Sequence, residues 1–97
     1  MRVISRRKLR EFWGRHPESE EVLSDWYNKI RRIVPANLAE LRRTFSSADA
    51  VGDCTVFNVG GNNYRVIVHL DYKIQIAWIR FVLRHADYDK EKWKADC

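Results

Sequence analysis

The spacing of hydrophobic residues changes near Cys54, from a period close to 3.6 to a period of 2. Before that point, Leu9, Phe12, Trp13 and His16 recur at the spacing of one helix face. After it, apolar and polar residues alternate as they do in half-buried strands. Helices followed by strands predict an α+β fold, with helices packed on one face of a small twisted antiparallel sheet.

Local sequence signals predict where the individual helices and strands begin and end. Proline, glycine and capping signals separate them. Asn37 followed by Glu40 three residues later resembles a capping box before a short third helix. A second helix buries Val22, Trp26 and Ile30. We expect a short strand over 2–5, a first helix over 6–16, a loop over 46–53, and strands over 54–59, 64–70 and 74–83.

Chain length and composition restrict the class of protein. With 97 residues, the chain is expected to form a single domain over 1–97. No apolar run approaches the roughly 20 residues that a bilayer span requires. Charged residues occupy the N-terminal region where a secretory segment would be apolar. We therefore expect a soluble, cytoplasmic protein.

Two cysteines and a basic net charge bear on partners and cofactors. Cys54 and Cys97 are too few for a metal or disulfide framework, so we expect reduced thiols. The formal net charge of +5 favours an anionic partner, either nucleic acid or an acidic protein. No zinc site, Ser/His/Asp triad or phosphate-binding glycine loop is present, and we expect no metal or cofactor.

Residues 60–63, Gly-Gly-Asn-Asn, lie between two predicted strands. No helix follows the glycines, so they are interpreted as turn residues and not as a dinucleotide-binding loop. Asn62 is a candidate for RNA contact, although asparagine also tolerates positive φ in turns. Both interpretations of Asn62 remain open.

Two arginines on neighbouring strands suggest an anion site. If Tyr72 and Lys73 form a two-residue hairpin loop, Arg65 lies directly opposite Arg80 on the same face of the sheet. Like charges opposite each other cost stability, so such a pair indicates a site for an anion. Alternatively, each arginine faces solvent beside a carboxylate. Under the same alternation Trp78 shares this face, where it would either stack on an RNA base or be buried.

His85 and Tyr88 are spaced i, i+3 and share one side of a helical turn. Imidazole exchanges protons near neutral pH, and RNA cleavage needs a group that removes the 2'-hydroxyl proton or protonates the leaving oxygen. Tyr88 would orient the phosphate or stack on a base. The alternative is that both residues close the end of the chain against the sheet.

The chain resembles the HigB branch of the RelE-like ribonuclease toxins of bacterial toxin–antitoxin pairs. The resemblance lies in FNVGGN with the following Tyr-Arg-Val, in Ile-Arg before a short aliphatic stretch, and in His-x-x-Tyr-Asp near the end. It implies a RelE-like fold and an endoribonuclease that cuts messenger RNA on the ribosome. It also implies silencing by a cognate helix-turn-helix antitoxin of the HigA type.

The resemblance also implies which residues carry the reaction. The positions that match basic, histidine and tyrosine residues of such toxins are Arg65, Arg80, His85 and Tyr88. Lys90 and Lys92 are lesser candidates, for RNA binding together with Asn62 and Trp78. The best-known RelE-type sites use a lysine pair on the central strands, which this chain lacks, so the general base is not identified. A non-catalytic RNA- or ribosome-binding module is the alternative, because a basic sheet with exposed aromatic residues also suits binding alone.

Overall fold

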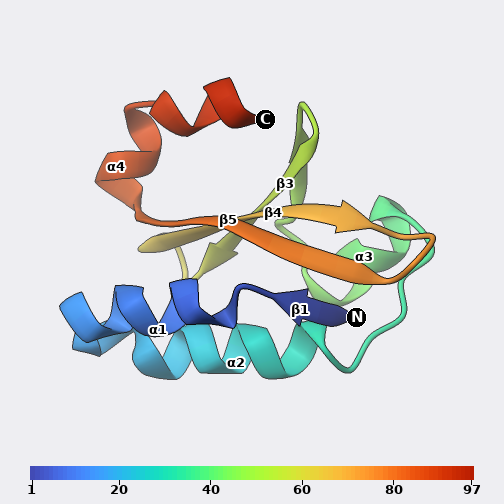
Figure 1. Cartoon of the computed structure of the whole chain (residues 1–97), viewed down its shortest axis with the longest axis horizontal. Helices are drawn as coiled ribbons and strands as arrows, with labels where there is room; N and C mark the ends of the chain where they lie inside the picture. Colours follow the sequence, from blue (N-terminus) through green and yellow to red (C-terminus); the bar gives the residue numbers. More distant parts are fainter.

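The computed structural model describes residues 1–97 and has the helices-then-strands order expected of an α+β fold (Figure 1). No helix in it is both long enough and apolar enough to span a bilayer. The strands are β1 (Arg2–Ile4), β2 (Asp49–Val51), β3 (Cys54–Val59), β4 (Tyr64–Asp71) and β5 (Ile76–Arg84). The helices are α1 (Arg6–Arg15), α2 (Glu20–Ile30), α3 (Leu38–Thr44) and α4 (His85–Asp89), with short 3-10 helices η1 (Pro17–Ser19) and η2 (Lys92–Asp96).

The five strands form one sheet in the order β1-β5-β4-β3-β2. Strands β2 to β5 pair antiparallel, as predicted for β3 to β5, whereas β1 pairs parallel with β5. The parallel pairing is possible because all the intervening elements form the long connection that parallel neighbours need. The loop predicted over 46–53 is wrong in part, because residues 49–51 form edge strand β2. This strand carries no alternating apolar pattern, since two of its three residues are exposed.

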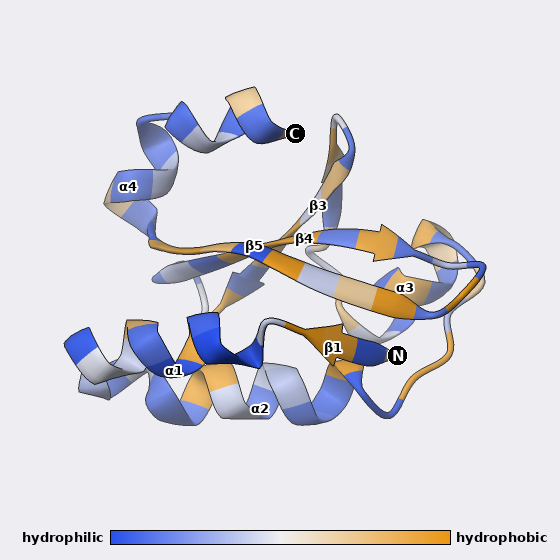
Figure 2. Cartoon of the chain, in the orientation of Figure 1, coloured by the Kyte–Doolittle hydropathy of each residue, from blue (hydrophilic) through white to orange (hydrophobic).

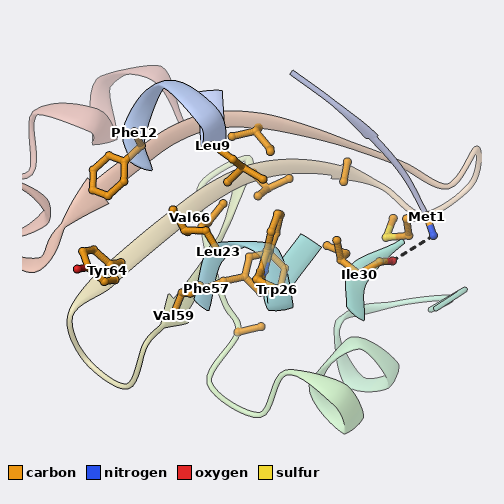
Figure 3. Close-up of a cluster of buried hydrophobic side chains, with 14 of the residues drawn as sticks. Met1, Leu9, Phe12, Leu23, Trp26, Ile30, Phe57, Val59, Tyr64 and Val66 are labelled. Atoms are coloured by element: carbon orange, nitrogen blue, oxygen red, sulfur yellow. Dashed lines mark hydrogen bonds between the residues drawn. The ribbon is translucent and has the colours of Figure 1, made fainter. Parts of the chain in front are cut away.

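The helices α1 and α2 lie together on one face of the sheet, with mostly hydrophilic outer surfaces (Figure 2). The predicted apolar face of the first helix is confirmed for Leu9 and Phe12, which are buried against the sheet. In α2, Leu23, Trp26 and Ile30 are buried. Figure 3 shows these side chains meeting those of the strands in one core. The helix face of the sheet therefore holds most of the buried apolar surface.

The capping box predicted before α3 is confirmed. The Asn37 side chain accepts a hydrogen bond from the Glu40 amide at 2.9 Å. The Glu40 carboxylate in turn accepts one from the Ala36 amide at 3.2 Å. Two otherwise unpaired amides at the start of the helix are thereby satisfied.

The β4–β5 connection differs from the predicted two-residue loop. Four residues, 72–75, form the turn, so that Asp71 pairs with Ile76. The Asp71 carboxylate accepts hydrogen bonds from the amides of Lys73 and Ile74, and Gln75 adopts a φ of 59°. These side-chain contacts stabilise a longer turn than strand periodicity alone suggests. The predicted start of the strand over 74–83 is therefore two residues early.

A second, smaller cluster lies on the face opposite α1 and α2, where α4 and η2 fold back over the sheet (Figure 1). Trp93 of η2 is buried there against Val56 and Ile67. Cys54 and Cys97 form a disulfide, so the expectation of reduced thiols is wrong. The two cysteines are 43 residues apart, and only the folded-back segment brings them together. The disulfide joins this segment to β3.

Candidate active site

The candidate site lies where β4 and β5 end beside the β3–β4 turn. Arg65 pairs with Leu83, close to the end of β5, and α4 begins directly after Arg84. The amide of His85 donates to the Asn63 carbonyl at 2.9 Å. This hydrogen bond joins the start of α4 to the turn and brings His85 next to Arg65.

Arg65 is buried at 5% exposure, and its guanidinium is almost fully hydrogen-bonded. One terminal nitrogen, Nη1, donates to the carbonyls of Asn62 and Tyr64 at 3.1 and 3.0 Å. The other, Nη2, meets the Asn62 side-chain oxygen and lies 3.0 Å from Nδ1 of His85. These contacts use the four hydrogens on the two terminal nitrogens. Arg65 is therefore built to hold the turn and the histidine in place.

His85 lies between an arginine and a carboxylate. Arginine can only donate hydrogen bonds, so Nδ1 of His85 is the acceptor from Arg65. The other ring nitrogen, Nε2, then carries the hydrogen and lies 3.0 Å from Asp89 Oδ2. The side chains of His85 and Asp89 are 45% and 58% exposed. The ring is thus fixed in orientation while its Nε2 side remains accessible to a substrate.

Tyr88 adds an aromatic surface to the site. Its ring lies 5.0 Å from the central guanidinium carbon of Arg65. On the other side it stacks on Trp93, with ring centroids 5.0 Å apart and planes inclined by 14°. The Trp93 indole donates to the Tyr88 carbonyl at 2.9 Å. The small cluster around Trp93 therefore contacts the site through Tyr88.

The predicted pairing of Arg65 with Arg80 is wrong. Arg65 pairs with Leu83, and Arg80 falls at a β-bulge, because Ile67 pairs with Phe81 while Val68 pairs with Ile79. A bulge inserts one residue and shifts the side-chain alternation beyond it. As a result Phe81 packs on the Trp93 side of the sheet and Val82 on the helix side, the reverse of what uninterrupted alternation from Ile79 would give.

Arg80 and Trp78 lie in a different group of residues. Together with Lys8 and His69 they line a cavity of about 420 Å³ between the start of α1 and the strands. The His69 and Trp78 rings are 5.6 Å apart, and Lys8 Nζ donates to the Arg80 carbonyl at 2.9 Å. The structure therefore brings together Arg65, His85 and Tyr88 but separates Arg80 and Trp78 from them.

The remaining candidates near the site differ in their contacts. Asn62 uses its side-chain oxygen on Arg65, which supports the structural interpretation of this residue. Lys90 lies 3.5 Å from Asp87 Oδ1, and Lys92 is exposed on η2. The two lysines line one cavity together, beside α4. Both present positive charge to this cavity.

Asp87 is an ionised group close to the site. Its carboxylate accepts a hydrogen bond from Nε of Arg84 at 3.1 Å. This hydrogen bond, with the positive charges of Arg84 and Lys90, lowers the pKa of Asp87 below its ordinary value. Asp87 is therefore a permanent hydrogen-bond acceptor at neutral pH.

Two side chains that contact the candidate site residues are absent from the sequence-based prediction. Asp89 follows His85 at i, i+4, a spacing that places two helical residues side by side and was the available signal. Trp93 has no comparable signal, because its position depends on the C-terminal segment folding back to β3.

Comparisons with known proteins all match the same family. The model of a family described as HigB_toxin, the RelE-like toxic component of a toxin-antitoxin system, matches residues 19–91. The chain is 28% identical over 93 residues to an mRNA interferase HigB of Escherichia coli O6:H1, covering 93% of this chain and 90% of that protein. It is 29% identical over 92 residues to the mRNA interferase toxin HigB of Escherichia coli K12, covering 92% and 88%.

Proposed function

The chain belongs to the HigB toxin family of RelE-like toxins, and we propose that it acts as a single-domain endoribonuclease that cleaves messenger RNA with His85 as its proton-transfer residue. Two relatives named mRNA interferase align over most of both chains, which supports this activity. The observation that carries the assignment of the site is the position of His85, held between Arg65 and Asp89 with one ring edge open to solvent.

The reaction requires a balanced exchange of one proton. The 2'-hydroxyl oxygen attacks the adjacent phosphorus, the bond from phosphorus to the 5' oxygen breaks, and a 2',3'-cyclic phosphate and a 5'-hydroxyl result. In our proposal neutral His85 accepts the 2'-hydroxyl proton, and Asp89 stabilises the resulting imidazolium through its 3.0 Å contact with Nε2. The imidazolium then protonates the leaving oxygen and His85 returns to its neutral form.

Arg65 and Tyr88 assist this exchange in different ways. The guanidinium of Arg65 lies 3.0 Å from Nδ1 of His85 and fixes the orientation of the ring. Arg65 is therefore a positioning residue, and its buried positive charge also stabilises the negative charge that develops on the non-bridging phosphate oxygens. Tyr88 orients the phosphate or stacks on a base. Arg80, outside this cluster, contacts the RNA backbone away from the cleaved bond, together with Trp78.

A toxin of a toxin–antitoxin system has an antitoxin as its partner. We propose that this antitoxin is HigA-like and carries a helix-turn-helix region. We further propose that cleavage occurs in the cytoplasm on translated messenger RNA held by the ribosome. The formal net charge of +5 supports binding to ribosomal and messenger RNA. The open position of the site supports a role for the ribosome in presenting the strand.

The test is induced expression of His85→Gln and wild-type protein, followed by mapping of transcript ends. Wild-type protein should arrest growth and produce cuts within translated reading frames. The variant should lose at least 10²-fold in cleavage rate, in line with general acid–base contributions of about 10²–10⁴. The matched control is His16→Gln, a substitution of a histidine that packs on Phe12 of α1, far from the site in the sequence.

Circular dichroism and size-exclusion chromatography should show that both variants are folded. A His85→Gln protein that cuts at the wild-type rate would remove His85 from the reaction. Folded wild-type protein that binds ribosomes without cutting would favour the non-catalytic RNA- or ribosome-binding module. Equal cutting of translated and untranslated RNA by purified protein would contradict the dependence on translation.

A further inference from the structure

The disulfide between Cys54 and Cys97 attaches the segment that carries the candidate site to the sheet. Cys54 opens β3 and is 3% exposed, whereas Cys97 follows η2 and is half-buried. The chain has no other cysteine, so this disulfide is the only place where a thiol can exchange with it. Exchange requires access to one of the two sulfurs, and Cys97 is the more accessible residue of the pair.

Apart from the disulfide, few contacts hold η2 to the sheet. The amide of Asp53 donates to the Cys97 carbonyl at 2.7 Å, and this is the only hydrogen bond between residues 92–97 and any residue before His85. Trp93 supplies the apolar contact, in a cluster of four buried residues. Figure 1 shows the segment crossing back over the sheet toward the hairpin of β2 and β3. The docked position of η2 therefore depends strongly on the disulfide.

A short series of contacts leads from the disulfide-linked segment to the candidate site. Trp93 stacks on Tyr88, with ring centroids 5.0 Å apart. The Tyr88 ring lies 5.0 Å from the guanidinium carbon of Arg65. Nη2 of Arg65 lies 3.0 Å from Nδ1 of His85. Undocking of η2 would withdraw the ring that supports Tyr88 and would loosen the orientation of His85.

The cellular compartment gives this disulfide a meaning beyond stability. Thiols in the cytoplasm are kept reduced, and cytoplasmic disulfides are usually transient, catalytic or redox-sensing. We propose that Cys54 and Cys97 form an exchange site for low-molecular-weight thiols such as glutathione, and that reduction undocks η2 and lowers the ribonuclease activity. The inference rests on the proposed function, which places cleavage in the cytoplasm. The toxin is then most active when the glutathione pool becomes oxidised.

Reduction of the disulfide balances with two molecules of glutathione. The first glutathione thiolate attacks Sγ of Cys97, the bond between the two cysteine sulfurs breaks, and the sulfur of Cys54 leaves and takes up a proton. A second glutathione thiolate attacks the glutathione sulfur of the mixed disulfide, which releases Cys97 as a thiol after protonation. The protein gains two electrons and two protons, and the two glutathione molecules become one glutathione disulfide.

Equilibration with glutathione tests the exchange site itself. Wild-type protein is incubated in buffers of increasing ratio of reduced to oxidised glutathione, free thiols are alkylated, and mass spectrometry counts them. The pair should be oxidised in oxidised glutathione and reduced in millimolar reduced glutathione, with the far-ultraviolet circular dichroism largely retained. A disulfide that persists in millimolar reduced glutathione would be purely structural and would overturn the proposal. Unfolding of the whole chain on reduction would overturn it as well, because the segment would not move independently.

Cleavage of translated messenger RNA is then measured in thiol-free buffer with protein preset in each state. Reduction should lower the rate roughly 10- to 100-fold, because displacing a catalytic group by about 1 Å can cost about 10²-fold, and reoxidation should restore it. Cys54→Ser/Cys97→Ser protein should cut at the reduced rate after either pretreatment. The matched control is Ser46→Ala/Ser47→Ala at two exposed positions, which keeps both cysteines and should keep the full response.

NMR signals of two residues separate this proposal from the proposed function. On reduction, the His85 amide, which donates to the Asn63 carbonyl, should lose protection from hydrogen exchange, and the Trp93 indole signal should shift. Amides of α2 should stay protected. If these signals change reversibly but neither state cuts RNA, the ribonuclease assignment fails and redox-controlled docking stands. If both states cut RNA at the same rate, redox control fails and the ribonuclease assignment stands.

Discussion

The two faces of the sheet are stabilised by different means. The helix side holds a cluster of 15 buried residues, drawn mainly from α1, α2, α3 and the strands. The opposite side holds a cluster of four buried residues, Cys54, Val56, Ile67 and Trp93. The disulfide links Cys54 of this cluster to Cys97. His85, Asp89 and Tyr88 all belong to the segment that covers the second cluster.

The difference indicates a division of roles between the faces. Burial of apolar area is the main stabilising term in a domain of this size, and it is concentrated on the helix side. The other face buries less, so it has room for polar groups, exposed cations and a cavity. A covalent link compensates for the small cluster there. Substitutions on the helix side should therefore destabilise the whole protein. Substitutions on the other side should mainly loosen α4 and η2, the segment that carries the site.

The largest expected effect is that of Phe57→Ala on the helix side. Phe57 is 1% exposed and meets Trp26 and Phe45 edge to face. Truncation should lower the free energy of unfolding by about 3–5 kcal/mol, because it removes apolar burial and leaves a cavity. Urea denaturation measures this. Ile74→Ala, at a 58% exposed position, is the control and should stay within about 0.5 kcal/mol. Equal losses in both variants would contradict the assignment of the core.

Breaking the disulfide should have the next largest effect. A crosslink that closes a loop of this length typically stabilises by about 2–4 kcal/mol, so Cys54→Ser/Cys97→Ser should lower the unfolding free energy by that amount. Hydrogen exchange should show loss of protection in α4 and η2 before α1 and α2. Wild-type protein in reductant is the control and should match the double variant. Uniform loss of protection across both faces would contradict the division of roles.

Sequence reasoning was most effective where the signal was local. The stripe of Leu9 and Phe12 and the capping box of Asn37 each depend on residues within one or two turns of helix. The proximity of Tyr88 to His85 follows from helical spacing in the same way. Such features are fixed by backbone periodicity, and the α+β class followed from them.

The features that escaped prediction depend on contacts between distant segments. The extra residue at Arg80 shifts the β5 alternation, and no local pattern distinguishes it from an ordinary strand residue. The disulfide requires 43 residues to fold before Cys97 reaches Cys54. The Arg65 pairing was therefore predicted with the wrong partner, although Arg65 itself lies at the site through its contact with His85.

A smaller effect is expected from Arg65→Lys, which keeps the charge but removes the planar set of donors. The carbonyls of Asn62 and Tyr64 and Nδ1 of His85 lose geometrically matched partners. Unsatisfied buried groups of this kind cost about 1–3 kcal/mol in unfolding free energy. Activity should fall further than stability, because His85 loses its fixed orientation. The control is Arg43→Lys on the exposed side of α3, which should change neither quantity. A stable but fully active Arg65→Lys protein would remove the positioning role.

The smallest effect concerns acid stability and Asp87, which lies on the less buried face. The hydrogen bond from Arg84, then the positive charges of Arg84 and Lys90, lower the pKa of Asp87 in the folded protein below its ordinary value of 3.8. The unfolded chain therefore binds a proton first as the pH falls. The contribution of ionised Asp87 to stability is fully present above about pH 4 and is lost as the pH falls through the lowered pKa of the folded state.

The urea midpoint of the Asp87→Asn variant should consequently lie closer to that of wild-type protein at low pH than at pH 6. Because the side chain is solvent-exposed and screened, the difference should be small. The difference in midpoint should shrink further in 1 M salt. A midpoint difference that grows as the pH falls would show that Asp87 is not held ionised by its neighbours.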